Sequence, residues 1–248
     1  MTAVFKTPTR LHVPGAVHLQ RFSRSFQGKR VLDEVQLEIP AGQFVALLGE
    51  SGSGKSTLLR ALAGLDADAH SSGTAQAEGN VSVLFQDARL LPWLRVIDNL
   101  TLGLEGASAR AAAEQMLGDV GLADKAQVWP STLSGGQKQR ASLARSLLRE
   151  PHVLLADEPF GALDALTRMR MHALLRRLVE RIRPTVILVT HDVDESLLLA
   201  DRILVLQDGK IAEDHAVPLP HPRRPDHPIF MQLRSTLLRS LGVDTEFA

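Results

Sequence analysis

Short runs of consecutive apolar residues recur along the chain, and most are followed by a longer segment whose apolar positions repeat with helical spacing. Runs that are apolar throughout are typical of strands covered on both faces, whereas half-covered strands alternate apolar and polar positions. The pattern predicts strands at residues 17–25, 35–39, 44–48, 81–85, 153–156 and 185–190. It predicts helices at residues 55–63, 108–120, 134–148, 166–183, 194–200 and 229–241.

The alternation of strands and helices predicts an α/β fold with a largely parallel sheet. Asp208-Gly209 is a two-residue turn sequence, so the last strands should form a hairpin. Residues 66–79 are either a loop or an edge strand, and residues 87–149 are expected to form an inserted helical subdomain. We divide the chain into a loose tail (1–16), a main domain (17–217) and a proline-rich tail with a short helix (218–248).

Composition excludes several classes of protein. Lysine plus arginine and aspartate plus glutamate number 28 each, so no global field draws the chain to nucleic acid, and we expect no such partner. Cysteine is absent, which excludes disulfides and thiolate metal sites. No run of 18 apolar residues occurs and the first residues lack a signal pattern, so we expect a soluble, cytosolic chain.

A glycine-rich segment follows the apolar run 44–48 and opens the next helix. It fits G-x-x-x-x-G-K-[ST], in which backbone N–H groups surround phosphate oxygens, the lysine reaches the β- and γ-phosphates, and the hydroxyl suits Mg²⁺. The alternative is a turn that only caps a helix. We predict an ATP-binding loop of Gly49, Glu50, Ser51, Gly52, Ser53, Gly54, Lys55, Ser56 and Thr57.

Two adjacent carboxylates, Asp157 and Glu158, end the apolar run 153–156. If that strand lies beside the one before the glycine-rich loop, Asp157 can hold Mg²⁺ there. Glu158 then points to the γ-phosphate, where a carboxylate can orient and deprotonate a water molecule. The alternative is an acidic helix start, which needs no ligand.

His191 and Gln86 also follow apolar strands, at the end of the sheet where ligands of α/β proteins bind. His191 is a candidate hydrogen-bond partner of the γ-phosphate, although a single histidine is more often structural. Gln86 is a weaker candidate for contact with Mg²⁺ or with the attacking water. With Lys55 and Glu158, these residues complete the predicted catalytic set.

A second glycine-rich helix start, L-S-G-G-Q at residues 133–137, raises the question of why one chain needs two. Ser134 and Gln137 form a capping box, which satisfies the helix start without any ligand. Gly135 and Gly136 are not needed for a cap and cost about 1 kcal/mol each inside a helix. We therefore expect two copies arranged head to tail, with this helix start facing the nucleotide held by the other copy.

These motifs, in this order, resemble the ATP-binding subunits of ABC transporters over residues 17–213. The resemblance implies a P-loop ATPase of the ABC type, with a mostly parallel sheet core, an antiparallel β subdomain and an inserted helical subdomain. It implies that Phe26 stacks on adenine, although a core or rim phenylalanine is the alternative. It also implies that Gln86 links the nucleotide to membrane subunits, that Asp164 crosses a dimer interface and that His191 senses the phosphate.

The segments F-Q-D-A-R-L-L-P-W and H-P-R-R-P narrow the resemblance to the nitrate, sulfonate and taurine importers, and most of all to the aliphatic-sulfonate importers. The implied activity is ATP hydrolysis that drives sulfonate import, with ATP and Mg²⁺ as cofactors and Ser56, Gln86 and Asp157 around the metal. The implied partners are a second copy, membrane permease subunits and a periplasmic or lipid-anchored solute-binding protein, with the chain on the cytoplasmic face of the inner membrane.

Import of taurine, nitrate or a related solute stays open at this stage. A soluble ABC ATPase that acts on nucleic acid or ribosomes is a rival, but such chains commonly carry two cassettes or a long coiled-coil insertion, and this one has neither. A P-loop kinase is a further rival, but its activity requires neither L-S-G-G-Q nor the carboxylate pair.

Overall fold

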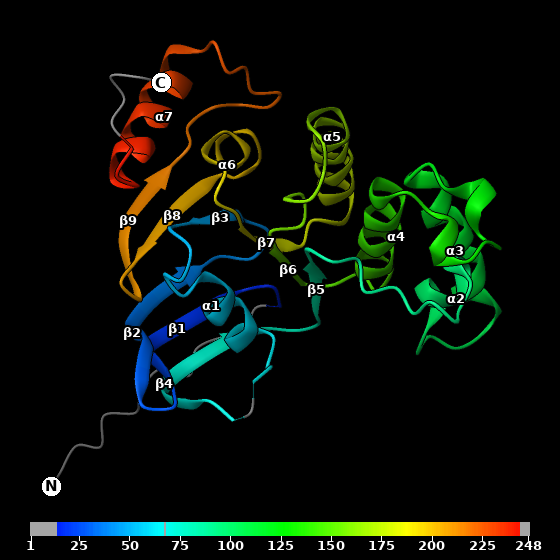
Figure 1. Cartoon of the computed structure of the whole chain (residues 1–248), viewed down its shortest axis with the longest axis horizontal. Coiled ribbons are helices and arrows are strands. Elements are labelled where there is room, and N and C mark those ends of the chain that lie inside the picture. The colour runs from blue at the N-terminus through cyan, green and yellow to red at the C-terminus, as the bar shows by residue number, and fades with distance from the viewer. Residues whose placement is uncertain (1–13, 67, 244–248) are drawn as a thin grey trace, which may run out of the picture.

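A six-stranded sheet forms the centre of the protein, and a separate three-stranded sheet packs against one of its sides (Figure 1). The computed structural model describes residues 14–66 and 68–243. The six strands lie in the order β5-β6-β7-β3-β8-β9, and all except β9 run parallel to their neighbours. They span β3 Phe44–Leu48, β5 Val81–Phe85, β6 Val153–Asp157, β7 Thr185–Val189, β8 Arg202–Gln207 and β9 Lys210–Ala216.

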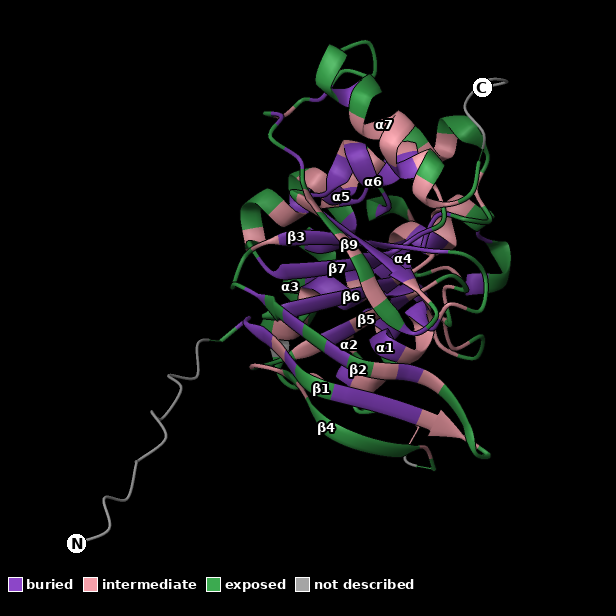
Figure 2. Cartoon of the chain, turned by 90° about the vertical axis from the view of Figure 1, so that its left-hand side faces the viewer, coloured by how far each residue is buried: buried purple, intermediate pink, exposed green. Residues whose placement is uncertain are grey.

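The central strands are apolar throughout because both faces of the sheet are covered. In β3, Phe44, Ala46 and Leu48 belong to one apolar cluster, whereas Val45 and Leu47 belong to another on the opposite face. Figure 2 shows the same burial along β3, β6 and β7. The strand prediction at 44–48 is therefore confirmed, and so is the one at 81–85.

The smaller sheet is antiparallel, in the order β2-β1-β4. Residues 66–79, for which the sequence allows either a loop or an edge strand, contain the edge strand β4. Its side chains are mostly exposed, which explains the weak apolar signal (Figure 2). The strands and the helix beside them span β1 Val17–Phe26, β2 Lys29–Ile39, β4 His70–Ala77 and α1 Lys55–Leu62.

Helices on the other side of the sheet form a lobe next to β5 (Figure 1, right). They include α2 Val96–Thr101, α3 Ala107–Asp119 and α4 Gly135–Leu148, with 3-10 turns at Ala123–Lys125 and Pro130–Thr132. The remaining helices are α5 Ala165–Ile182, α6 Val193–Leu199 and α7 Pro228–Ser240. A mostly parallel core, an antiparallel sheet and a helical insertion are the fold class that the sequence predicts.

The proline-rich segment after Val217, which the sequence predicts as a tail, is packed against the main domain. Leu219 is buried, and the side chain of Arg223 is 1% exposed. Arg223 Nη1 donates to the Leu197 carbonyl at 2.7 Å, at the end of α6. Phe230 and Leu237 of α7 are buried in the same apolar cluster as α6. The segment thus caps and covers α6, because an arginine can satisfy the free carbonyls at a helix end.

His221, in the same segment, is expected to make stability depend on pH. Burial and the charges of Arg223 and Arg176 lower its pKa from 6.5 to about 4, against the opposing effect of Asp201 and Glu180. The unfolded chain therefore binds more protons between these values, so stability falls as the pH drops from 6.5 towards 4.

Urea unfolding at several pH values measures this dependence. In His221→Leu the slope of unfolding free energy against pH should fall by up to one proton in that window. An unchanged slope would contradict the assignment to His221.

Candidate functional site

The carboxyl ends of four parallel strands bring the predicted site residues to one edge of the sheet. Phe85 of β5 pairs with Asp157 of β6, which pairs with Val189 of β7, and Val189 pairs with Leu47 of β3. The residues that follow these strand ends therefore share one edge, since parallel strands all point the same way. They are Gln86, Glu158, His191 and the loop that begins at Gly49.

The loop from Gly49 to Gly54 packs tightly against strand β8. A Cβ added at Gly49 would lie 2.3 Å from the Leu206 carbonyl oxygen and 2.7 Å from Ser53 Oγ. The loop leads directly into α1, so backbone N–H groups of the first turn are available at this end of the helix. That is the environment in which helix starts bind phosphate.

Lys55 is buried at the base of this loop, with 6% of the residue exposed. Its ammonium donates to the carbonyls of Gly49 at 2.8 Å and Glu50 at 2.7 Å. Burial lowers the pKa of Lys55, and the charges of Glu158 and Asp157 oppose that change. The ammonium is thus held close to the loop and to both carboxylates.

Ser56 and Asp157 meet in space, as the metal hypothesis requires. Ser56 Oγ donates to Asp157 Oδ1 at 2.9 Å. The prediction that the strand before the glycine-rich loop and the strand of Asp157 are neighbours is wrong, because β7 lies between β3 and β6. The contact forms because Ser56 reaches across from the first turn of α1. A hydroxyl and a carboxylate side by side are the oxygen donors that Mg²⁺ prefers.

Glu158 and His191 also lie together, with 3.2 Å between Glu158 Oε2 and His191 Nδ1. Glu158 has a positive φ of 43°, which turns its side chain at the strand end, and its backbone N–H donates to the Val189 carbonyl at 3.0 Å. Gln86 borders the same space: a Cβ added at Gly161 would lie 3.3 Å from Gln86 Nε2 and 3.8 Å from Glu158 Oε2. These three side chains surround one position at the sheet edge.

Phe26 lies at the end of β1, where it pairs with Lys29 across the β1–β2 turn. A cleft of about 690 Å³ is lined by the following residues of β2 together with Glu50, Ser51, Gly52 and Ser53 of the glycine-rich loop. Phe26 is half-buried, and the guanidinium carbon of Arg24 lies 5.9 Å from its ring centroid. Its predicted stacking on a base remains a prediction.

The second glycine-rich helix start carries the expected capping box. Ser134 N donates to Gln137 Oε1 at 2.9 Å, and Gln137 N donates to Ser134 Oγ at 3.3 Å. Only one of the two glycines is left without a local reason. A Cβ on Gly136 would lie 2.7 Å from Thr167 Cγ2, so packing within the chain requires this glycine, contrary to the expectation from the sequence, whereas Gly135 faces open space.

A cleft of about 1070 Å³ brings this helix start together with Asp164. Asp164 is exposed and caps α5, and its Oδ1 accepts from Thr167 N at 3.0 Å. Hydrogen bonds from the hydroxyl and the backbone N–H of Thr167 hold the pKa of Asp164 below its usual range. The residues that line the cleft include Ser134, Gly135, Gly136, Gln137 and Asp164.

Figure 1 shows α4 in the right-hand lobe and α1 on the other side of β5 and β6. The predicted residues thus form two separate groups, one around Lys55 and Glu158 and one around Ser134 and Asp164. A single copy therefore does not bring the Ser134 helix start to the loop of Lys55.

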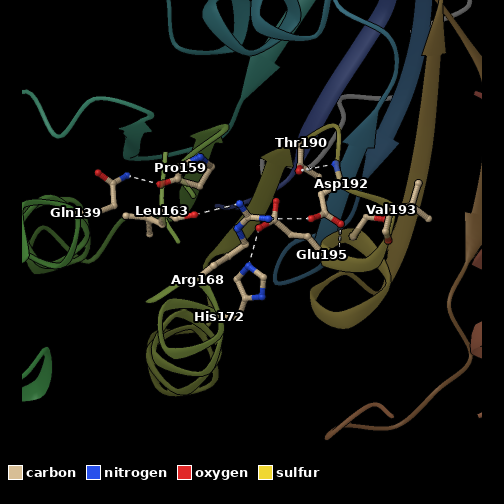
Figure 3. Close-up of polar contacts among 10 residues, drawn as sticks. Gln139, Pro159, Leu163, Arg168, His172, Thr190, Asp192, Val193 and Glu195 are labelled. Atoms are coloured by element: carbon tan, nitrogen blue, oxygen red, sulfur yellow. Dashed lines mark hydrogen bonds and ion pairs between the residues drawn. The ribbon is translucent and has the colours of Figure 1, made fainter. Parts of the chain in front are cut away.

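Gln139 is a buried residue of this region that the sequence reasoning missed. It is 3% exposed, and its amide donates to the Pro159 carbonyl at 2.7 Å (Figure 3) and to the Phe85 carbonyl at 3.0 Å. These carbonyls belong to the residue after Glu158 and the residue before Gln86. Gln139 therefore fastens α4 to both of those loops.

Replacement Gln139→Leu should destabilise the fold by about 1–3 kcal/mol, because it leaves two carbonyls without their donor. Thermal or urea unfolding measures the change. Gln115→Leu is the matched control, since Gln115 is an exposed glutamine of α3 and a surface change should stay within about 0.5 kcal/mol. Equal effects of the two substitutions would contradict the role given to Gln139.

Residues 32–161 match the family model of the ABC transporters. The chain belongs to the ABC transporter family. Among the curated members of this family, it is 79% identical over 238 residues to the aliphatic sulfonates import ATP-binding protein SsuB of Delftia acidovorans, covering 96% of this chain and 99% of that protein. It is 71% identical over 231 residues to SsuB 1 of Paracoccus denitrificans (strain Pd 1222), covering 93% and 96%.

Solved structures of ABC cassettes have the same fold as this ABC family chain. The dimeric structure of MJ0796, a bacterial ABC transporter cassette, superposes with a TM-score of 0.72 at 30% identity, covering 82% of this chain and 100% of that one. A post-hydrolysis dimer of the same cassette, bound to ADP and Pi, gives a TM-score of 0.70 at 30% identity and the same coverage.

None of the helices in the described residues combines the length and the apolar character that crossing a membrane requires.

Proposed function

We propose that this chain is the ATP-hydrolysing subunit of a bacterial ABC importer for aliphatic sulfonates. The observation that carries the proposal is its 79% and 71% identity to two sulfonate import ATP-binding proteins, over almost the whole length of each. The positions of Lys55, Asp157 and Glu158 at one sheet edge support ATP hydrolysis as the activity.

ATP binds at the glycine-rich loop in this proposal. The backbone N–H groups of the loop and of the first turn of α1 hold the phosphates, and Lys55 neutralises charge on the β- and γ-phosphates. Phe26 stacks on the adenine ring. A neighbouring family structure bound to ADP and Pi supports nucleotide binding at this fold.

The residues at this edge also fit Mg²⁺. The adjacent oxygens of Ser56 and Asp157 provide two donors of the preferred kind, and the Gln86 amide oxygen is a third candidate. When bound, the ion would neutralise charge on the transferring phosphoryl group.

Hydrolysis then requires positioning and charge stabilisation rather than a covalent intermediate. Glu158 accepts the proton of the attacking water, since its carboxylate lies at the sheet edge beside Gln86. His191, 3.2 Å from Glu158, contacts the γ-phosphate, and Gln86 responds to its presence. Lys55 stabilises the developing charge.

A second copy completes each site in the proposed mechanism. The Ser134–Gln137 helix start of one copy covers the γ-phosphate held by Lys55 of the other, and Asp164 crosses the interface. The dimeric form of the MJ0796 cassette supports an assembly of two copies. ATP binding closes the dimer and hydrolysis lets it open, because the bridging phosphate is lost.

Membrane permease subunits and, through them, a periplasmic or lipid-anchored solute-binding protein are the proposed partners. The chain would sit peripherally on the cytoplasmic face of the inner membrane. The proposed docking surface lies within residues 87–99, where Val96, Ile97 and Asn99 are buried but Trp93 is 68% exposed, as suits an interface residue.

Uptake of labelled sulfonates in a bacterial strain that lacks this chain tests the proposal. Restoring the chain should restore uptake of alkanesulfonates. Restored uptake of taurine or nitrate alone would replace the solute and keep the ATPase role, whereas ATPase activity with no effect on any transport would refute the transport role.

A further inference from the structure

Arg168, in the first turns of α5, connects two loops of the proposed catalytic region (Figure 3). Its Nη1 donates to Asp192 Oδ2 at 3.3 Å, and its Nη2 donates to the Leu163 carbonyl at 3.1 Å. Asp192 directly follows His191, and Leu163 directly precedes Asp164. One guanidinium therefore bridges the loop of His191 and the loop of Asp164.

Asp192, the partner of Arg168, makes further hydrogen bonds that fix the backbone on both sides of His191. Asp192 N donates to Thr190 Oγ1 at 3.1 Å, and Thr190 is 3% exposed. Asp192 Oδ1 also caps α6 by accepting from Glu195 N at 3.0 Å. The His191 side chain is 66% exposed, so little packing holds it, and its flanking residues set its direction.

His172, one turn further along α5, fastens the same two regions. Its Nε2 lies 2.6 Å from Glu195 Oε1 of α6; the Glu195 side chain is buried, and that of His172 is 12% exposed. Its ring meets Phe160 edge-on, with centroids 5.1 Å apart. Phe160 follows Glu158 by two residues and is 1% exposed. Helix α5 thus holds the segment after Glu158 and the helix after His191 in a fixed relation.

We propose that Arg168 is a positioning residue: by joining the Leu163 carbonyl to Asp192, it holds His191 against Glu158. The inference rests on the ATP hydrolysis proposed above. Arg168 acts through Asp192 and does not touch the nucleotide. Misplacement of a catalytic group by about 1 Å can cost up to about 100-fold in rate, so loss of this bridge should lower turnover more than substrate binding.

The experiment compares steady-state ATP hydrolysis by the purified full-length chain and its variants in the presence of Mg²⁺. Arg168→Met should lower kcat about tenfold and change KM for ATP by less than about twofold. Arg168→Lys keeps the charge but replaces the two-nitrogen fork of the guanidinium with a single ammonium nitrogen, so an intermediate kcat is expected. Arg181→Met is the matched control, since it breaks an ion pair of the same helix to Asp119 and should keep wild-type kcat.

A double-mutant cycle shows whether Arg168 acts through Asp192. Asp192→Asn can still cap α6 but weakens the ion pair. If the bridge is the cause, Arg168→Met with Asp192→Asn should be no slower than Arg168→Met alone. ATP-dependent dimer formation, measured with Glu158→Gln present, should be unchanged by Arg168→Met.

Three results would overturn the inference: wild-type kcat in Arg168→Met, equal kcat losses in Arg168→Met and Arg181→Met, or independent losses that multiply in the double variant. If Arg168→Met fails to fold, Arg168→Lys and Asp192→Asn decide, and wild-type turnover in both would refute it. A wild-type chain that cannot hydrolyse ATP would refute the proposed function itself, whereas an active wild type with unaffected variants refutes only the role of Arg168.

Discussion

Glu158→Gln is expected to bind ATP and to lose nearly all hydrolysis, by roughly 100- to 10,000-fold in kcat. The amide keeps the size of the side chain but cannot take a proton from the attacking water. The backbone of Glu158 has a φ of 43°, and glutamine adopts this conformation as readily as glutamate, so the fold should be unaffected. ATP should then hold two copies together, because the step that releases the dimer is blocked.

Phosphate release measures the first part, and size-exclusion chromatography with ATP and Mg²⁺ measures the second. Glu150→Gln is a matched control, since Glu150 has a φ of 45° and lies outside both groups of site residues. That variant should keep wild-type turnover. Wild-type turnover in Glu158→Gln would remove Glu158 as the base.

The strands of the core could be predicted from the sequence because burial on both faces leaves a continuous apolar run. This holds for β3, whose five residues are all buried. Prediction from an apolar run fails for the start of β2, where Lys29 and Arg30 are exposed and pair with β1 across the turn at Gln27-Gly28. Sequence patterns report burial, so an exposed strand that is held by backbone pairing gives little signal.

The order of strands could not be predicted from local patterns. Asp157 and Ser56 are 101 residues apart, and their strand and helix meet across β7. The motifs predict this contact correctly, but the assumption that the two strands are neighbours is wrong. Strand order depends on how the crossover helices pack, which no single motif specifies.

The supporting polar residues were the least predictable part of the site. Gln139 stands among polar residues in L-S-G-G-Q-K-Q-R, a pattern that is typical of an exposed position. It is buried only because β5 and Pro159 approach α4. Arg168 and Asp192 are separated by 24 residues. Their pairing follows from the packing of α5 against α6, which the sequence does not show.

Ser134→Arg is expected to leave ATP binding by a single copy intact and to abolish ATP-driven dimerisation. Ser134 is exposed and lines the cleft that Asp164 also lines, and its helix α4 lies away from α1, across β5 and β6, in its own chain (Figure 1). An arginine there would fill the space that the second copy's nucleotide occupies in the proposed dimer. Turnover should fall roughly 100-fold or more, since the helix start that stabilises the γ-phosphate is displaced.

The substitution also removes a helix cap, so the two effects must be separated. Ser134→Ala loses the hydrogen bond to Gln137 N, at about 1 kcal/mol of stability, but adds no bulk. Ser108→Arg places the same side chain at an exposed serine of α3, outside the cleft. Both controls should dimerise with ATP when combined with Glu158→Gln, whereas Ser134→Arg should not. If Ser134→Arg loses nucleotide binding as a monomer, Ser134 belongs to the primary site of its own chain, and the head-to-tail arrangement is wrong.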